Sequence, residues 1–388
     1  MFIIDKAYAD KICEFYASKS NNILLGSKCD NKCKFCSQDQ LPRHMRLGFL
    51  PQRSLEEAKK CVGLLDKEGD SVIIAEPQRV LQSDPLNYPH ILELIKYIRK
   101  RCPRAKILVT NTAGVAIDRA MISGFRKVKN IFFNISLVST QRCNQDWMLN
   151  DGVKTRQIID LVSKAPGITY GFTVIAMAQF LPWKDIEETI FYLDRYKPRL
   201  ITVFTYSYTD YSRYKPAKKN DGLIKEFGFF IAGLKRQLNS KLLFYPVTEN
   251  QSPLVYGLFD EYFKKVSEMQ KIYQNIRILA LVSEAIFEVA QKRLKIFGNI
   301  KVKPVKNLSL GGNIVAAGLL STSDYIKAAE GEECDLVMVS NKPFMKNGMD
   351  LFGRHFNCIS KALHKPVTII NSEEKWNRNL KDYEIFKN

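Results

Sequence analysis

The sequence predicts an α/β protein whose parallel sheet forms a partial (β/α)6 TIM-like barrel, followed by a smaller C-terminal α/β domain. Two observations carry this prediction. Apolar runs that alternate with amphipathic helical stretches fill about the first 250 residues, and the alternation starts afresh after a long helical stretch. Strands that are apolar throughout must be covered on both faces, as helices cover a parallel sheet. A doubly wound sheet is the alternative arrangement of the same units.

Six apolar runs predict the strands of the barrel. They are rich in β-branched and aromatic residues and have the length of buried strands. They cover residues 22–26, 71–75, 105–110, 130–138, 168–176 and 200–206. A seventh run, at 241–250, predicts a further strand that enters a loop.

Three helices between these strands are recognisable from their ends. Ser54 is followed three residues later by Glu57, which is the pattern of a capping box, and apolar residues then recur at helical spacing as far as Leu65. The stretch 89–101 opens with a proline, expected in the first turn, and closes with cations that suit a helix C-terminus. The stretch 185–196 is amphipathic in the same way.

The second α/β series sets the expected domain organisation. A long helix is expected at about residues 256–274, and strand and helix signals alternate from there to about residue 370. We expect an N-terminal extension at 1–20, the partial barrel at 21–250 and the C-terminal domain at 251–388. No Gly/Ser-rich linker marks the boundary, which predicts that the second domain docks on the first.

The chain is strongly basic, with 59 Lys and Arg against 40 Asp and Glu in 388 residues and a net charge of +19. Such a charge suits an anionic partner such as a nucleic acid, but lysine-rich enzymes also carry it. The lysines are spread along the chain without a basic block, so we favour the second explanation. The N-terminus lacks the apolar region of a signal peptide, and the apolar runs are shorter than the ~20 residues of a membrane span. We therefore expect a cytoplasmic protein that does not bind membranes.

Three of the 9 cysteines lie together directly after the first predicted strand. Cys29, Cys33 and Cys36 have the spacing C-x3-C-x2-C. In a reducing compartment, clustered thiols indicate metal or redox chemistry rather than disulfides. Three thiolates suit three irons of a [4Fe–4S] cluster and leave the fourth iron open. A zinc site is the alternative, but it needs a fourth ligand, for which His44 is the nearest candidate.

This spacing, after the first strand of a strand–helix series, resembles the radical S-adenosylmethionine (SAM) superfamily. The resemblance implies an enzyme in which Cys29, Cys33 and Cys36 ligate a [4Fe–4S] cluster whose open iron binds SAM. It implies that reduced ferredoxin or flavodoxin supplies an electron, and that SAM cleavage yields a 5′-deoxyadenosyl radical that abstracts a substrate hydrogen. Phe35, the aromatic residue before the third cysteine, is then expected beside the adenine.

The same resemblance implies further contacts to SAM. Glu76 stands where the family's second strand ends in a turn that binds the SAM amino group, although the usual glycines are absent. Ser136 stands where the family places a polar side chain near the ribose or carboxylate, and Asn134 shares its strand face. Asn111, beside Thr110 at the end of the third strand, is another candidate. For each of these residues, the alternative is an ordinary role in a turn or at the end of a strand, where the side chain hydrogen-bonds to backbone groups.

A closer resemblance is to radical SAM proteins that carry a C-terminal domain called DUF512. It rests on the Asp-Gln-Leu-Pro segment at 39–42 with Arg46 after it, and on the segment 306–326. Only about 20 residues precede the first strand, where that family usually has a PDZ-like domain, and the loop after the fifth strand differs. The resemblance therefore implies a divergent member with an unidentified substrate and no assigned catalytic residue.

Several questions stay open from the sequence alone. Gly311, Gly312 and Asn313 fit either an anion- or ligand-binding loop or a plain turn, because glycine permits positive φ and close backbone approach. Cys143 fits either an ordinary cysteine or a hydrogen-atom donor or methyl acceptor. An RNA-binding or RNA-modifying protein with a metal-stabilised loop is the alternative function. The absorption of the anaerobic protein would distinguish an iron–sulfur enzyme from a colourless zinc protein.

Overall fold

The computed structural model describes most of the chain. The described residues are 3, 5–26, 33–36, 41–42, 49–74, 84–141, 152–216, 223–245, 253–344 and 348–370. The chain divides into two compact units. The first consists of Met1–Gln38, Leu47–Tyr206 and Pro216–Tyr245, and the second of Asp39–Arg46, Ser207–Lys215 and Pro246–Asn388.

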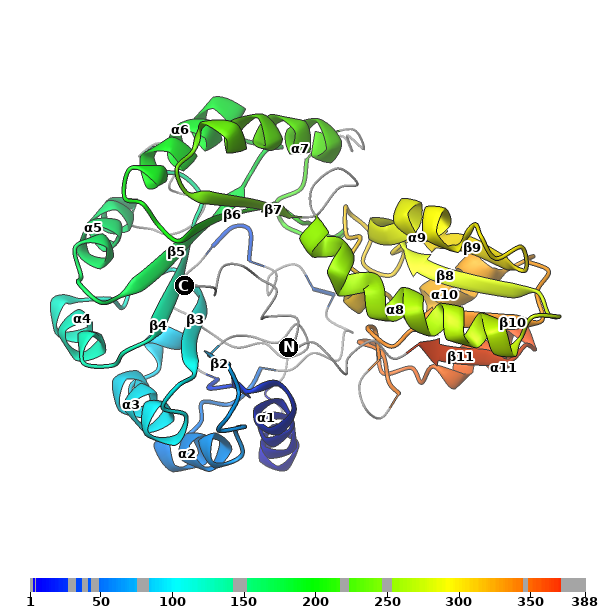
Figure 1. The fold of residues 1–388 in the computed structure, drawn as a ribbon, viewed down its shortest axis with the longest axis horizontal. Helices are drawn as coiled ribbons and strands as arrows, with labels where there is room; N and C mark the ends of the chain where they lie inside the picture. The colour runs from blue at the N-terminus through cyan, green and yellow to red at the C-terminus, as the bar shows by residue number, and fades with distance from the viewer. Residues whose placement is uncertain are drawn as a thin grey trace. The chain divides into compact units, whose positions relative to one another are not determined.

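The first unit is built on a seven-stranded sheet in which neighbouring strands are parallel. The strands follow one another in chain order and curve into an arc (Figure 1). They are β1 (Asn22–Ile23), β2 (Ser71–Ile74), β3 (Lys106–Thr112), β4 (Ile131–Leu137), β5 (Thr169–Ala176), β6 (Leu200–Thr205) and β7 (Lys241–Tyr245). A doubly wound sheet reverses its strand order at one point, so the consecutive order confirms the partial barrel for this unit.

Helices cover the outer side of this sheet (Figure 1). They are α1 (Lys6–Ser20), α2 (Leu55–Gly63), α3 (Ile91–Arg101), α4 (Arg119–Arg126), α5 (Gly152–Ser163), α6 (Trp183–Asp194) and α7 (Leu223–Leu234). Strand side chains such as Phe133 and Val174 are 0% exposed, as expected for a sheet face under helices. The stretch expected as an N-terminal extension contains α1, which contacts β1 and α2.

Of two helix starts that the sequence predicts, the structure confirms one and contradicts the other. The capping box of α2 is confirmed, because the Glu57 amide donates to Ser54 Oγ at 3.2 Å and the Ser54 amide donates to Glu57 Oε2 at 2.9 Å. The expectation that Pro89 lies in the first turn of α3 is wrong. The helix begins at Ile91 after His90, because the residues before it form a turn that follows a short 3-10 helix at Pro85–Asn87.

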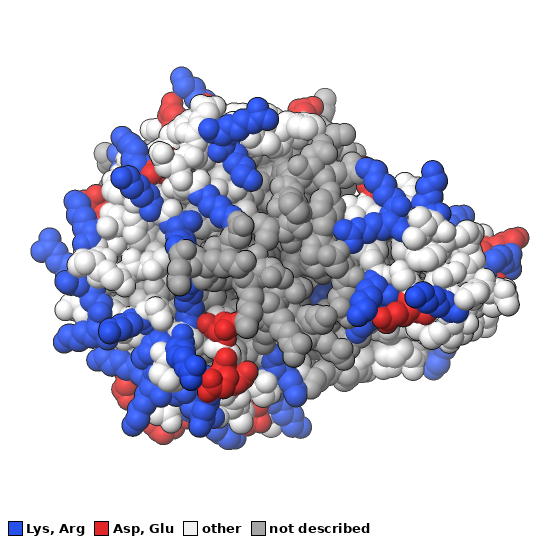
Figure 2. All heavy atoms as spheres, viewed as in Figure 1, with Lys and Arg blue, Asp and Glu red and all other residues white. Residues whose placement is uncertain are grey.

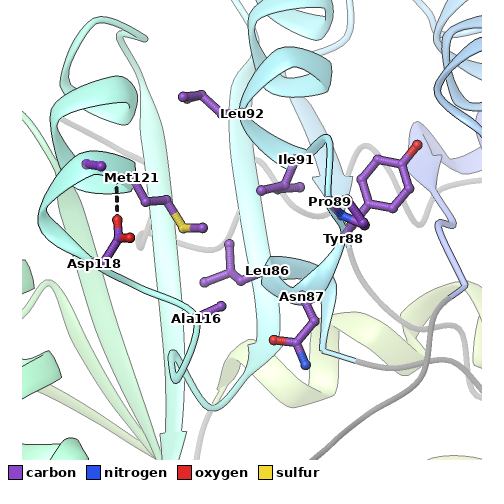
Figure 3. Close-up of a pocket in the computed structure, with 10 residues that line it drawn as sticks. Leu86, Asn87, Tyr88, Pro89, Ile91, Leu92, Ala116, Asp118 and Met121 are labelled. Atoms are coloured by element: carbon purple, nitrogen blue, oxygen red, sulfur yellow. Dashed lines mark hydrogen bonds between the residues drawn. The ribbon is translucent and has the colours of Figure 1, made fainter.

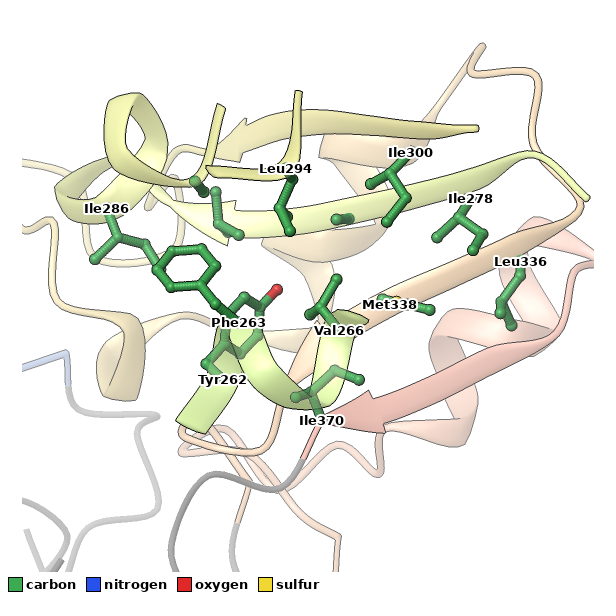
Figure 4. Close-up of a cluster of buried hydrophobic side chains, with 13 residues drawn as sticks. Tyr262, Phe263, Val266, Ile278, Ile286, Leu294, Ile300, Leu336, Met338 and Ile370 are labelled. Atoms are coloured by element: carbon green, nitrogen blue, oxygen red, sulfur yellow. The ribbon is translucent and has the colours of Figure 1, made fainter. Parts of the chain in front are cut away.

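The second unit is a smaller α/β domain, as expected. Its four strands are parallel and have the order β11–β10–β8–β9. They are β8 (Ile278–Ser283), β9 (Ile300–Val305), β10 (Leu336–Ser340) and β11 (Val367–Ile370), and the helices are α8 (Pro253–Ile272), α9 (Phe287–Leu294), α10 (Thr322–Ala329) and α11 (Asn357–Leu363). Figure 4 shows one of its cores, where Tyr262 and Val266 of α8 pack against Ile278 and Met338 of the sheet. In this sheet the strand order reverses at β8, because β9 lies on one side of it and β10 and β11 lie on the other.

Candidate functional site

The chain leaves β1 along a backbone path that is fixed by the segment before α2. Gly26 has a φ of +57°, and a Cβ at this position would lie 2.3 Å from the Pro51 carbonyl oxygen, so only glycine fits. The Arg53 amide donates to the Leu25 carbonyl oxygen at 2.8 Å. The loop that follows therefore starts at the carboxyl end of a parallel strand, which is the end where barrel proteins place their sites.

Cys33 and Cys36 lie in that loop and are joined by a tight turn. The Cys36 amide donates to the Cys33 carbonyl oxygen at 3.1 Å. Both cysteines and the intervening Phe35 are half-buried, and neither cysteine forms a disulfide. Half-buried thiols on one turn are accessible to a metal while partly shielded from solvent, which suits cluster ligands.

Several residues singled out from the sequence lie outside the described part of the chain. These are Cys29, Glu76, His44 and Cys143, together with residues 39–40 and 46. The backbone of Asn111 belongs to β3, but its side chain is outside the described part. Among the described residues, no three His, Cys, Asp or Glu side chains gather in a way that could hold a metal ion. A three-thiolate site depends on Cys29 and remains a prediction.

Asn134 and Ser136 share the inner face of β4. They are half-buried, whereas Phe133, Ile135 and Leu137 between and beside them are at most 1% exposed under the helices. Asn134 Oδ1 is buried and has no hydrogen-bond partner within the described structure. An unsatisfied buried acceptor costs stability, so its retention here indicates a position suited to a ligand that brings a donor.

The strand positions opposite this pair lie on β5. Asn134 lies opposite Gly171 of β5, where an added Cβ would lie 2.9 Å from Phe132 Cζ, and Ser136 lies opposite Thr173, a buried hydroxyl. Asn22 of β1 also has a buried Oδ1 without a partner in the described part of the chain. The inner face of β4 therefore carries the polar side chains of Asn134 and Ser136 beside the apolar Phe132, whereas Phe133, Ile135 and Leu137 on its other face are all apolar. The inner face is thus the candidate ligand surface.

Asp84 is a residue near this edge that the sequence patterns did not single out. Its side chain is 4% exposed; Oδ1 accepts the Leu86 amide at 3.0 Å, and Oδ2 accepts the Ala113 amide just after β3 at 2.8 Å. Burial raises the pKa of Asp84 above its ordinary value, against the lowering effect of these bonds and of Thr112. Asp84 fixes the end of the β2–α3 connection onto the end of β3. The Asp-Pro pair at 84–85, a common start of a helical turn, was the available sequence signal.

The Gly311–Asn313 segment of the second unit is a turn that holds its own chain. The Gly312 amide donates to Asp210 Oδ1 at 2.9 Å, and Asn313 Oδ1 accepts the Tyr208 amide at 2.7 Å. The Asn313 amide in turn donates to the Tyr208 carbonyl oxygen at 3.0 Å. A Cβ at Gly312 would lie 1.9 Å from that same oxygen, which explains the glycine. Of the two possibilities left open by the sequence, these contacts favour the turn.

A surface cavity of about 510 Å³ lies on the helical side of the first unit (Figure 3). It is bounded by the start of α3 and by α4, with Leu86, Ile91 and Met121 among its walls. Asp118, the one carboxylate among the described residues that line it, caps α4 by accepting the Met121 amide at 2.6 Å. The other lining residues that the structure describes are apolar apart from Asn87 and Tyr88, so the described lining does not gather a set of charged groups.

Lys and Arg side chains are scattered over the helices on the face drawn in Figure 2, without one dominant patch among the described residues. Many are paired, as in Lys59 with Glu93 at 3.0 Å and Lys60 with Glu14 at 2.7 Å. This distribution agrees with a compositional origin of the net charge. Within the described residues, no helix combines the length and apolarity needed to cross a membrane.

The chain is similar in part to several solved structures, whereas no protein-family profile and no curated protein matches its sequence. Streptococcus suis SuiB aligns with a TM-score of 0.44 and 18% identity, over 58% of this chain and 49% of SuiB. Native anSMEcpe with bound AdoMet aligns with a TM-score of 0.43 and 12% identity, over 57% of this chain and 64% of that one. Methylornithine synthase (PylB) aligns with a TM-score of 0.38 and 13% identity, over 98% and 93% of the two chains.

The chain thus spans about half the length of SuiB. TM-scores this low do not establish a shared fold.

Proposed function

We propose that this chain is a radical SAM enzyme in which Cys29, Cys33 and Cys36 hold a [4Fe–4S] cluster. The observation that carries the proposal is the Cys33–Cys36 turn, with two half-buried cysteines in the loop after the first strand of a partial barrel. The thiolate donor set suits iron, and a set of three leaves one iron open for SAM. The buried, unpartnered Asn134 Oδ1 on the inner face supports a ligand with hydrogen-bond donors there.

When bound, the cluster and SAM supply one-electron cleavage of the sulfonium and a radical that abstracts hydrogen from an unreactive C–H bond. The residues of this chain bind and orient these groups. Phe35 packs by the adenine, Glu76 accepts from the SAM ammonium, and Asn134 and Ser136 hold the ribose or carboxylate, with Asn111 as a further contact. A carboxylate that faces an ammonium is a charge-assisted pair, which makes Glu76 the strongest of these contacts.

The finer assignments belong to the same proposal. Reduced ferredoxin or flavodoxin is the proposed electron donor, and the cytoplasm is the proposed compartment because half-buried free thiols such as Cys33 and Cys36 persist in reducing surroundings. The DUF512-containing family remains the proposed group, with a barrel at 21–250 and its C-terminal domain at 251–388. The substrate is unassigned.

Anaerobic purification tests the proposal directly. We expect a brown protein with about four iron and four sulfide per chain after reconstitution, and a change in the cluster's electron paramagnetic resonance spectrum when SAM is added. Cys102→Ala is the control, since Cys102 is buried beside α3 and far in sequence from the loop. A colourless protein that binds one zinc with full occupancy would replace the enzyme with the metal-loop alternative.

A further inference from the structure

The sheet of the second unit has the strand order of a doubly wound domain. Counted along the chain from β8, its strands lie in the order 2-1-3-4, which reverses between β8 and β10. The core on one face includes residues of α8 and α9, such as Val266 and Ala290, and the core on the other includes residues of α10 and α11, such as Tyr325 and Ile359. The connections that follow β8 and β10 therefore lead to opposite faces. Doubly wound sheets bind their ligands outside the carboxyl ends of the strands at such a point.

A serine stands at the carboxyl end of each of these two strands. Ser283 ends β8 and Ser340 ends β10, and the two strands are paired. Ser340 Oγ accepts the Lys342 amide at 3.2 Å. Ser283 is 3% exposed, yet its side chain does not cap the 3-10 helix Glu284–Ile286 that follows it and makes no hydrogen bond with the described residues. A buried hydroxyl without a partner costs stability, so its presence at this point indicates a ligand.

Positive charges flank Ser283 on both sides. On one side Ser283 pairs with Val305, the last residue of β9, and Lys306 follows directly. Lys306 is exposed and has no ion pair within the described residues. On the other side, the loop after β10 carries Lys342, while the exposed Glu284 next to Ser283 opposes the two cations. Cations on either side of a hydroxyl donor suit a doubly charged anion.

The acids buried at this edge of the sheet are occupied by the backbone. Asp324 is 2% exposed, and its Oδ1 accepts the amides of Leu308 and Ser309 at 3.0 Å each. Asp350 is 0% exposed, and its Oδ2 accepts the Thr322 amide at 2.7 Å. Backbone amides thus compensate both carboxylates, and Asp324 fixes the loop that begins after β9.

We propose that the edge of the second unit between the carboxyl ends of β8 and β10 binds the phosphate group of a small molecule, which is inorganic phosphate or a phosphate ester such as a nucleotide. Ser283 Oγ donates to a phosphate oxygen, and Lys306 and Lys342 compensate the charge of the anion. All three residues belong to the second unit, so the proposal does not depend on the iron–sulfur cluster or on SAM.

Calorimetric titration of the full chain with inorganic phosphate, AMP and ATP tests the proposal. We expect at least one of these probes to bind at one site per chain, with an affinity that falls as salt is added. Equal affinities for phosphate and AMP would identify the phosphate group alone as the ligand, and tighter binding of AMP would identify an ester. In the wild-type protein, the bound probe should slow hydrogen exchange in residues 283–287 and 340–344.

Variants at the edge should change the affinity in opposite directions. Lys306→Gln should weaken binding about tenfold and Ser283→Ala about threefold to tenfold, since each removes a hydrogen bond to the anion. Glu284→Gln should strengthen binding by up to about fivefold, because it removes an exposed like charge. Lys301→Gln is the matched control at the amino end of β9, where Glu332 keeps its contact with Lys303 at 2.7 Å; it should change the affinity less than about twofold.

Three outcomes would overturn the proposal. One is that none of the three probes binds at millimolar concentration. Another is that Lys306→Gln and Lys301→Gln weaken binding equally, which would mean that only the net charge attracts the anion. The third is that the probe slows hydrogen exchange in the first unit alone. The exchange map of the wild-type protein decides the question even where Ser283→Ala folds poorly.

Discussion

The Cys33–Cys36 turn and the Gly311–Asn313 turn drew attention for the same reason, since each places residues of special chemistry in a short loop. They differ in where their polar groups go. In the Gly311–Asn313 turn, the polar groups that could bind a ligand are hydrogen-bonded within the chain, to Asp210 and to the backbone of Tyr208. In the first, two half-buried cysteines follow a strand end. A short motif is therefore better interpreted from the hydrogen-bond partners of its residues than from its sequence alone.

The largest effect that tests this contrast is loss of the cluster. Cys33→Ala and Cys36→Ala should each remove nearly all bound iron and abolish SAM cleavage, because one iron loses its thiolate. The stability of the metal-free protein should change little, since both side chains are half-buried. Iron analysis and urea unfolding of the apoprotein measure the two quantities. Equal iron in Cys33→Ala and Cys102→Ala would remove Cys33 from the ligand set.

At Gly312, a substitution is expected to lower the stability of the protein rather than its iron content. An added Cβ would lie 1.9 Å from the Tyr208 carbonyl oxygen at a φ of +64°, so Gly312→Ala should destabilise the second unit by about 3 kcal/mol or more. Gly331 is the matched control, with a φ of +73° and no atom within 4 Å of an added Cβ, so Gly331→Ala should cost about 1–2 kcal/mol. Urea unfolding measures both. Similar losses for the two variants would mean that the turn tolerates a side chain.

Local patterns predicted the fold because they depend on neighbours in sequence. The strand runs, the capping box at Ser54 and the restart after residue 250 all reappear in the structure. The first turn of α3 was misplaced because the proline at 89 serves the turn before the helix.

The site was predicted less completely because its partners are distant in sequence. Nothing local tells that Asp210 meets Gly312 about a hundred residues later, or that Asp84 binds the Ala113 amide. The positions of Asn134 and Ser136 on one strand face were predictable, because side chains alternate along a strand.

Variants of Asn313 test whether its side chain acts as a hydrogen-bond acceptor within the turn or as a contact to a ligand. Asn313→Ala leaves the Tyr208 amide without its acceptor and should cost about 1–3 kcal/mol, whereas Asn313→Asp keeps an acceptor and should cost less than half of that. Cluster content should stay at the wild-type level in both. Chemical unfolding followed by fluorescence measures the difference. Equal losses of stability in the two variants would show that the side-chain Nδ2 donor of Asn313, not its Oδ1, holds the segment.

Asn134 should give opposite signs in two measurements. Asn134→Leu removes a buried acceptor that has no partner in the described structure, so the metal-free protein should be equally stable or slightly more stable. The affinity of the reconstituted protein for SAM should fall about tenfold, which corresponds to one hydrogen bond of ~1.4 kcal/mol. Equilibrium dialysis with labelled SAM measures the second effect. Unchanged affinity together with a loss of stability would make Asn134 a structural residue.

The smallest expected effect concerns the net charge of +19. Local acids already pair with several of the lysines, as Glu330 does with Lys327 at 2.6 Å, and the described Lys and Arg side chains are scattered over the face drawn in Figure 2 without one dominant patch. We therefore expect weak RNA binding with a Kd of about 10⁻⁴ to 10⁻⁶ M at physiological salt and no preference among sequences or structures. Filter binding over a range of salt concentrations tests this, since each neutralised phosphate adds about −0.9 (duplex) or −0.7 (single strand) to the log–log slope. A nanomolar, structure-selective complex with a slope near −5 would instead require a basic surface built for RNA, and RNA would become the first substrate class to test.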